Sequence, residues 1–176
     1  VTEIVKDNMA ELLSYAEVQK LLDETPKDYQ KLVADVIPGK TSVSGLQRIL
    51  QNLVAERISV RDMPSILEGI AEAASYTKNP MLVTEHVRAR LARQICTQNT
   101  NASGIVPLVT LGPQWEQAFA ESLMGDGEEK QLAISPSQLQ GFINAVRECY
   151  DKMAQIGESP VMLASPGIRP YVRSVI

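Results

Sequence analysis

The sequence contains few of the residues on which metal binding and nucleophilic catalysis usually depend. Its 176 residues include one histidine, His86, and two cysteines, Cys96 and Cys149. A lone histidine excludes the histidine-rich zinc sites, and the HExxH motif is missing. The cysteines lack a CxxC spacing, so we interpret them as reduced, half-buried thiols of a cytosolic protein. No metal and no cofactor is expected.

Long apolar runs and an excess of positive charge are also missing. No run of about 18 apolar residues occurs, so the chain is not expected to span a membrane, and its start does not resemble a signal peptide. The formal net charge is −4, which disfavours a general role in binding nucleic acid or an anionic membrane. Because the sequence begins without methionine and ends on an apolar stripe, we expect both ends to continue into a longer protein.

The motifs of nucleotide-binding and serine-dependent enzymes are absent as well. Neither a Walker loop nor the GxGxxG fingerprint is found, and the acidic loop at residues 125–130 does not have the alternating oxygen ligands of an EF-hand. Ser165 stands between an expected strand and an expected helix, but its surroundings read ASPG and not GxSxG. We interpret Ser165 as a helix cap. The sequence therefore predicts a protein that is not an enzyme.

The first hundred residues have strong helical periodicity. Apolar residues recur at i, i+3, i+4 and i+7, the spacing of a helix with one buried face. Ser14–Glu17 and Ser44–Gln47 have the spacing of capping boxes, and Asp62 is placed to cap a helix whose first turn contains Pro64. The pattern predicts helices over residues 2–13, 15–25, 29–37, 45–55, 63–73 and 81–98.

After residue 98 the pattern changes from helices alone to alternating strands and helices. Residues 99–104 are rich in Asn, Thr, Ser and Gly and predict a linker. Short strands are then expected at 105–111, 132–134 and 160–164, and helices at 113–124, from Pro136 onward and after Ser165. Strands separated by helices favour a parallel pair with a right-handed crossover. A sheet of so few strands is incomplete.

The predicted fold is mostly α with a small α/β part. Residues 1–13 form the end of a preceding subdomain, residues 14–98 a helical subdomain, and residues 99–104 a linker. Residues 105–176 form a small mixed α/β subdomain that is truncated at its C-terminus and has an incomplete sheet.

Two groups of charged residues are candidates for partner contacts. His86, Arg90 and Arg93 are spaced to share one flank of a helix, either as a partner- or anion-binding ridge or as a solvated face. Arg57, Arg61 and Asp62 flank a tight turn between two helices. They form ion pairs within the chain or contact a neighbouring subunit.

Several segments resemble a known family. Residues 37–39 read IPG, residues 46–68 read LQRILQNLVAERISVRDMPSILE, and residues 82–95 contain LVTEHVR and LARQI. Residues 160–170 read PVMLASPGIRP, which is similar to the family pattern PVLLVSP.LRP. These segments resemble the cytoplasmic C-terminal region of the large export-gate proteins of flagellar and type III secretion systems.

The resemblance implies a role in protein export at the cytoplasmic face of the bacterial inner membrane. Such proteins have a membrane half and a cytoplasmic half of four subdomains, which forms a nine-membered ring that receives export substrates and their chaperones. The expected partners are other copies of the chain, substrates with chaperones, and other export components including the ATPase complex. On this pattern residues 14–98 resemble the third subdomain and residues 105–176 the fourth.

The resemblance also suggests where contacts lie. Arg57, Arg61 and Asp62 are candidates for ring contacts, and Thr2 is the residue that borders the family's chaperone-docking site. A stand-alone helical adaptor is the alternative function, and an enzyme with a poorly marked site is a third. The choice between a flagellar and an injectisome system stays open at this stage.

Overall fold

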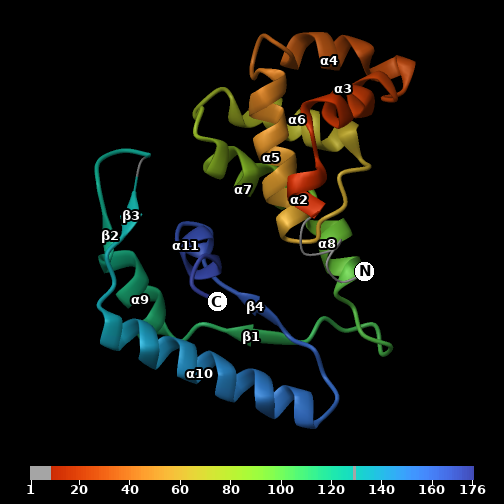
Figure 1. Ribbon diagram of the computed structural model, residues 1–176. Helices are drawn as coiled ribbons and strands as arrows, with labels where there is room; N and C mark the ends of the chain where they lie inside the picture. The colour runs from red at the N-terminus through yellow and green to blue at the C-terminus, as the bar shows by residue number, and fades with distance from the viewer. Residues whose placement is uncertain (1–8, 129) are drawn as a thin grey trace. The chain divides into compact units, whose positions relative to one another are not determined.

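A computed structural model describes residues 9–128 and 130–176 of the chain. The described chain divides into two compact units between Ile95 and Cys96 (Figure 1). The first unit is helical and the second mixes helices with two-stranded sheets. The expected fold, mostly α with a small α/β part, is confirmed.

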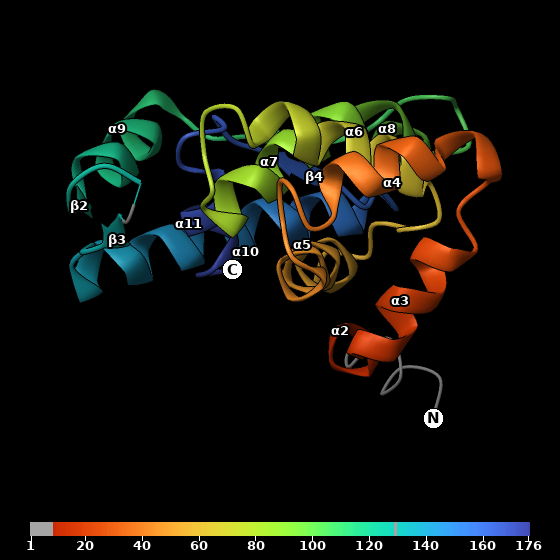
Figure 2. The same cartoon turned by 90° about the horizontal axis from the view of Figure 1, so that it is seen from above.

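The first unit consists of helices joined by short connections. They are α2 (Met9–Leu12), α3 (Tyr15–Asp23), a 3-10 turn η1 (Lys27–Tyr29), α4 (Gln30–Val36), α5 (Val43–Ala55), α6 (Met63–Ala73), α7 (Pro80–Arg90) and α8 (Ala92–Gln98), within which the division between the units falls. Figure 2 looks along the axis of α5, with α4, α6 and α7 to one side of it.

The apolar stripes of these helices meet in one core. Leu46, Leu50 and Leu53 of α5 are fully buried together with Ile66 and Leu67 of α6. Between α6 and α7 the backbones approach closely at Gly69, where a Cβ atom would lie 3.3 Å from the Cα atom of Val87. The absence of a side chain at Gly69 therefore sets how closely these two helices pack.

Side-chain caps fix where most of these helices begin. The Ser14 hydroxyl accepts a hydrogen bond from the backbone N–H of Glu17, and the Asp62 carboxylate accepts one from Ser65, as the spacing predicts. The expected cap at Ser44 is wrong. The hydroxyl of Ser42 accepts the N–H of Gly45 at 3.0 Å, so α5 begins at Val43, two residues earlier than predicted.

The single helix expected over residues 81–98 is also wrong. The chain leaves the helical conformation at Leu91, which separates α7 from α8. Leu91 is itself buried, so the apolar spacing continues across the break. The helix expected over residues 29–37 is present as α4, one residue shorter at each end, and η1 precedes it.

The short helix α2 is attached to α5 by two glutamine side chains. Gln47 and Gln51 lie one turn apart on α5, and both side-chain amides donate to the carbonyl oxygen of Leu13, at 2.9 and 3.3 Å. Most of the helix expected over residues 2–13 lies outside the described residues, and α2 is the described part.

Beyond the end of α8, the described residues of the second unit form two small sheets and the helices α9 (Pro113–Glu121), α10 (Pro136–Gln155) and α11 (Arg169–Arg173). Strand β1 (Leu108–Thr110) pairs in parallel with β4 (Val161–Leu163), with Val109 opposite Met162. The parallel pairing expected between the segments at 105–111 and 160–164 is confirmed. Strand β2 (Leu123–Met124) pairs antiparallel with β3 (Gln131–Leu132).

Strand β2 was not expected, because the sequence predicts helix up to residue 124. The helix ends at Glu121, where the Ser122 hydroxyl donates back to the carbonyl oxygen of Ala118 at 2.7 Å. The N–H of Ala133 then donates to the carbonyl oxygen of Ser122 at 2.8 Å, which continues the pairing of β2 with β3.

Aromatic rings form the core of the second unit. Phe142 of α10 packs edge-to-face against Phe119 of α9, with ring centroids 4.9 Å apart, and against Trp115 at 5.3 Å. Ile168 and Val172 complete the buried cluster. The rings of α9 and α10 therefore hold these two helices together.

Two further expectations for this part of the chain are wrong. Ser165 does not cap the last helix: α11 begins at Arg169, and the N–H of Ser165 instead donates to the Glu116 carboxylate at 3.0 Å. Both cysteines are unpaired as expected, but Cys96 and Cys149 are exposed and not half-buried.

Candidate functional surfaces

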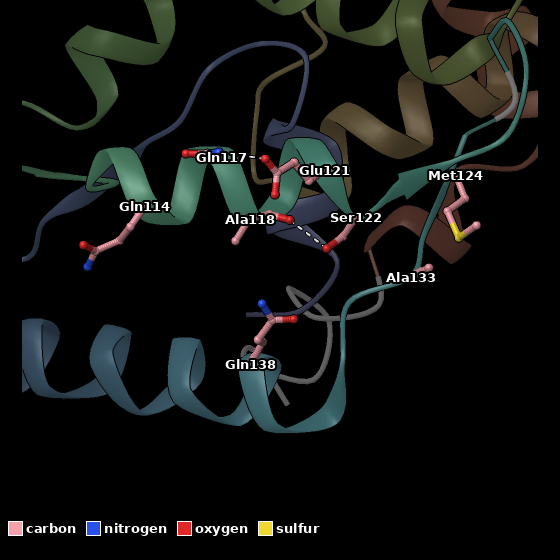
Figure 3. Close-up of a pocket in the computed structure, with 8 residues that line it drawn as sticks. All are labelled: Gln114, Gln117, Ala118, Glu121, Ser122, Met124, Ala133 and Gln138. Carbon is pink, nitrogen blue, oxygen red and sulfur yellow. Dashed lines mark hydrogen bonds between the residues drawn. The ribbon is translucent and has the colours of Figure 1, made fainter.

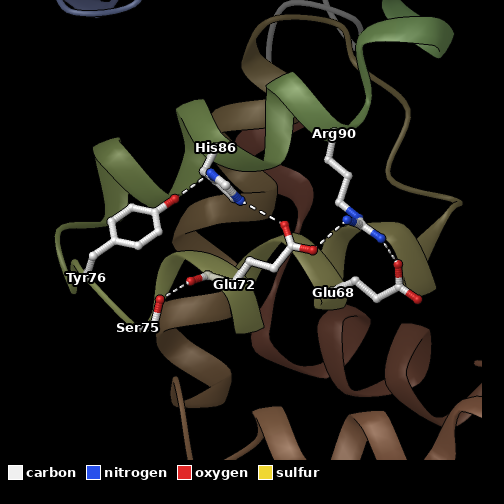
Figure 4. A network of polar contacts seen from close by, with 6 residues as sticks. All are labelled: Glu68, Glu72, Ser75, Tyr76, His86 and Arg90. Atoms are coloured by element: carbon white, nitrogen blue, oxygen red, sulfur yellow. Dashed lines mark hydrogen bonds and ion pairs between the residues drawn. The ribbon is translucent and has the colours of Figure 1, made fainter.

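The face between α6 and α7 carries a connected network of charged groups (Figure 4). His86 of α7 contacts the Glu72 carboxylate of α6 through Nε2 at 3.0 Å, and its Nδ1 contacts the hydroxyl of Tyr76. When Nε2 carries the ring proton, Nδ1 is the acceptor of the Tyr76 hydroxyl proton. Arg90 donates to Glu72 at 2.7 Å and also pairs with Glu68. Two of the candidate residues, His86 and Arg90, are therefore bound to side chains of the neighbouring helix.

The pairing in this network shifts two pKa values. The hydrogen bond from His86 is the main cause that lowers the pKa of Glu72, and the charge of Arg90 lowers it further. The hydrogen bond to Glu68 is the main cause that raises the pKa of Arg90. Both shifts favour the charged forms, so the network is an ion-pair system in the ordinary pH range.

A second set of contacts holds α7 to α5. Arg88 pairs with Glu56, which directly follows α5, and lies 4.0 Å from Glu85 of its own helix. Close by, the Asn52 side-chain amide donates to the hydroxyl of Thr84 at 3.2 Å. Charged and polar contacts thus hold α7 on two flanks, to α6 and to α5.

The turn between α5 and α6 contains the other candidate contact residues. Arg57 has a positive φ of 60°, the left-handed conformation that often ends a helix. Asp62 is occupied as the cap of α6, and Arg61 is exposed, with its backbone N–H 3.4 Å from the Ser59 hydroxyl. The Glu56 carboxylate pairs with Arg88 of α7. In this turn the Arg61 side chain is therefore exposed, whereas the Asp62 side chain stabilises the start of α6.

The remaining two candidates lie apart from these groups. Arg93 is on α8, beyond the break at Leu91, so it does not continue the same helical flank as His86 and Arg90. Thr2 lies outside the described residues. The expected ridge is therefore divided between two helices, with His86 and Arg90 on α7 and Arg93 on α8, and its role in partner binding stays a prediction.

A hollow beside α9 arises from the tertiary structure and is not marked by any sequence motif. It has a volume of about 300 Å³ and lies between α9, the start of α10 and the β2–β3 hairpin (Figure 3). Gln138 of α10 points toward α9, and the Gln117 amide donates to the Glu121 carboxylate at 2.7 Å. The lining residues are Gln114, Gln117, Ala118, Glu121, Ser122, Met124, Ala133 and Gln138.

A larger hollow, of about 680 Å³, also borders α9. Its walls are formed by the segment before α9, by α9 itself and by the connection between β4 and α11. Glu116 lies in this wall and accepts the N–H of Ser165. The lining residues are Leu111, Pro113, Glu116, Gln117, Ala120, Ser165, Gly167 and Ile168.

The described part of the chain offers little for metal or membrane chemistry. Within residues 9–128 and 130–176, no three side chains of His, Cys, Asp or Glu gather in a way that would hold a metal ion. None of the helices in this part combines the length and the apolar character that crossing a bilayer requires. What the geometry does offer is the charged surface of α6 and α7 and the two hollows beside α9.

Solved structures with the same fold define a class of protein. The nonameric SctV-C of EPEC is 25% identical to this chain, with a TM-score of 0.86. The match covers 99% of this chain and 52% of the SctV-C chain. The CdsV protein of Chlamydia pneumoniae, solved in a complex with CdsO, has a TM-score of 0.86 at 24% identity and matches 99% of this chain and 51% of its own. The fold is that of the cytoplasmic domains of type III export-gate proteins.

The family follows from the sequence comparison. The family model described as the FHIPEP family matches residues 1–176, so this chain belongs to the FHIPEP family. The flagellar biosynthesis protein FlhA of Caulobacter vibrioides is 56% identical to it over 176 residues, all of this chain. The chain spans 25% of the length of that relative.

Proposed function

We propose that this chain is part of a flagellar protein-export gate and acts as a section of its ring-forming scaffold and docking platform. The main support for this proposal is the 56% identity with an FlhA over all 176 residues. This identity favours a flagellar system over an injectisome and favours the gate over a stand-alone adaptor. The proposed site of action is the cytoplasmic face of the bacterial inner membrane.

The proposed partners are other copies of the chain, export substrates with their chaperones, and export components that include the ATPase complex. A nonameric relative with the same fold supports self-association in a ring. The complex of CdsV with CdsO supports the binding of a second protein by a chain with this fold. The paired charges of α5, α6 and α7 support a rigid scaffold without a catalytic step, because they hold the helices in a fixed arrangement.

A chimera tests the proposal. The aligned segment of the Caulobacter vibrioides FlhA is replaced by residues 1–176, and flagellin in the culture medium and swimming are measured. We expect the chimera to support both, while the same chimera with Leu53→Asp supports neither, because a charge enters the core of the first unit. A chimera that accumulates normally in the membrane and yet exports no flagellin contradicts the proposal.

We further propose that the turn between α5 and α6 contributes to ring contacts. Arg61 is exposed there, whereas Asp62 is committed to capping α6. In the chimera, Arg61→Glu is expected to reduce the amount of ring recovered by cross-linking, because it reverses the charge of an exposed residue at the proposed contact. Lys31→Glu, an equal charge change at an exposed position of α4, is the matched control. Equal effects of the two variants contradict this assignment.

A further inference from the structure

Helix α9 lies between the two hollows, and its outward-facing side chains line both of them. Gln117 is part of both linings. The inward face of the helix is fixed by Phe119, which is fully buried against α10. The outer face of α9 is thus a ridge with a depression along each flank.

Each hollow contains one charged side chain, and both are carboxylates. Glu121 lines the smaller hollow and Glu116 the larger one. Among the described residues that line either hollow, none is a lysine, an arginine or a histidine. The electrostatic field within both depressions therefore favours a cation.

Both carboxylates are held in place by a neighbouring donor. Glu116 accepts the backbone N–H of Ser165 at 3.0 Å, and Glu121 accepts the amide of Gln117 at 2.7 Å. Both of these hydrogen bonds use the Oε1 atom, and an ionised carboxylate has about four acceptor positions in all. A carboxylate already fixed in position loses less side-chain entropy when a cation binds.

The walls of the larger hollow suit the aliphatic part of a basic side chain. Leu111, Pro113 and Ile168 supply apolar surface, and around Gly167 the space is open, with no atom within 4 Å of where a Cβ would be. Lysine and arginine place their methylene groups along apolar surface while the charged end reaches a polar partner. The hollow offers both surfaces, with Glu116 in its lining.

We propose that α9 and its two flanking hollows form a docking surface for a basic helix of a partner protein. Two lysine or arginine side chains of that helix straddle the ridge, one paired with Glu116 and the other with Glu121. The two carboxylates lie five residues apart on α9, about 7.5 Å along its axis. A helix whose two cations are also about five residues apart matches this axial separation. The proposal deepens the docking role proposed above and rests on it.

Titration of the isotope-labelled chain with a synthetic helical peptide tests this surface. The probe is a capped Lys/Ala/Leu peptide of about 15 residues, long enough to be helical, and a peptide with Glu in place of Lys is its control. Amide chemical shifts locate the contact and give the dissociation constant. We expect the shifts to concentrate on α9 and around Ser165, and the affinity to fall as salt is added.

Charge-neutral variants decide between a specific surface and general attraction to an acidic protein. Glu116→Gln with Glu121→Gln is expected to weaken binding about tenfold or more, since each substitution removes a charge-assisted contact and keeps an oxygen that accepts the existing hydrogen bond. Glu148→Gln, at an exposed position on α10, is the control for each of the two substitutions made singly, and should change the affinity less than about twofold.

Three results overturn the proposal: equal weakening by the α9 variant and by Glu148→Gln, shifts centred away from α9, or equal binding of the acidic peptide. Melting curves of the variants confirm that they are folded. If the peptide does not bind while the chimera exports flagellin, this surface assignment alone is wrong. If the peptide binds but the chimera fails, the export role is wrong and the surface stands.

Discussion

The two units of the chain bury very different numbers of side chains. In the first unit, apolar residues from α3 to α7 and Leu91 join one continuous cluster, so each contributes a small share of the core. In the second unit the buried cluster is limited to Phe119, Phe142, Ile168 and Val172. The first core is built from repeated aliphatic stripes and the second from a few aromatic contacts. The loss of one side chain should therefore have a local effect in the first unit and a unit-wide effect in the second.

The largest effect is expected from placing a charge in the core of the first unit. Leu53 is fully buried, and Leu53→Asp should cost about 4–5 kcal/mol or more because the carboxylate has no partner there. Circular dichroism should show the loss of much of the helical signal. Leu12→Asp, at an exposed position of α2, is the control and should melt like the parent. A Leu53→Asp protein with an unchanged melting curve contradicts the described core.

The next effect tests whether the second unit depends on its aromatic rings. Phe142 is 1% exposed and contacts both Trp115 and Phe119. Phe142→Ala should cost about 3–5 kcal/mol and remove hydrogen-exchange protection across the second unit. Leu50→Ala should lower the free energy of unfolding by about 2–5 kcal/mol. The first unit should nevertheless stay folded, because many other residues share its core. If the Phe142→Ala protein keeps its hydrogen-exchange protection across the second unit, that unit does not depend on a few aromatic contacts as described.

A smaller effect is expected at the close approach of α6 and α7. A Cβ atom at Gly69 would lie 3.2 Å from the Val87 Cγ2 atom and 3.3 Å from its Cα atom, so Gly69→Val should cost about 1–3 kcal/mol. At Gly141 of α10 the nearest atom is 3.7 Å away, an ordinary contact. The free energy of unfolding of the Gly141→Val protein, measured by denaturant titration, should therefore lie within about 0.5 kcal/mol of that of the parent. Equal losses at the two positions would show that helix propensity, and not packing, decides.

The smallest effect concerns the α6–α7 network and pH. Because the folded pKa of Glu72 lies below its usual value of 4.5, the stabilisation by Glu72 is fully present above pH 4.5 and is lost as the pH falls through the folded pKa. Relative to Glu72→Gln, the parent should melt slightly higher near neutral pH and lose that advantage in acid. Glu148→Gln makes the matched change in the second unit, where Lys152 lowers the pKa of Glu148. If the difference in melting temperature between the parent and Glu72→Gln does not vary with pH, Glu72 does not take part in the ion pairs described.

The helical unit was largely predictable because its signals are local. Ser14 and Asp62 each cap a helix where the spacing indicates, and the buried faces of α5 and α6 follow from their apolar periodicity. The failures have physical causes. Ser42 and Ser44 are equally good caps by residue type, and only the backbone geometry selects Ser42. The break at Leu91 leaves the apolar spacing intact, so periodicity cannot reveal it.

The candidate surfaces were less predictable, because they depend on contacts between residues far apart in the sequence. The spacing of His86 and Arg90 indicates a shared flank, but not that Glu68 and Glu72 of the preceding helix bind them. No Gly or Pro separates Glu121 from β2, so the end of α9 is not marked in the sequence. The hollows beside α9 arise only when β4, α10 and the hairpin assemble around it.

The attachment of α2 to α5 has a consequence for how the sequence can vary. Its acceptor is the backbone oxygen of Leu13, an atom that every amino acid carries, so the side chain at position 13 is free to change without loss of the hydrogen bonds. The donors are the Gln47 and Gln51 amides, and the replacement of either leaves the other in place. Mutational drift should therefore be tolerated at either glutamine singly, whereas simultaneous replacement of both glutamines should release α2. At position 13 the drift should stay among apolar residues, because the Leu13 side chain packs against the core of the first unit.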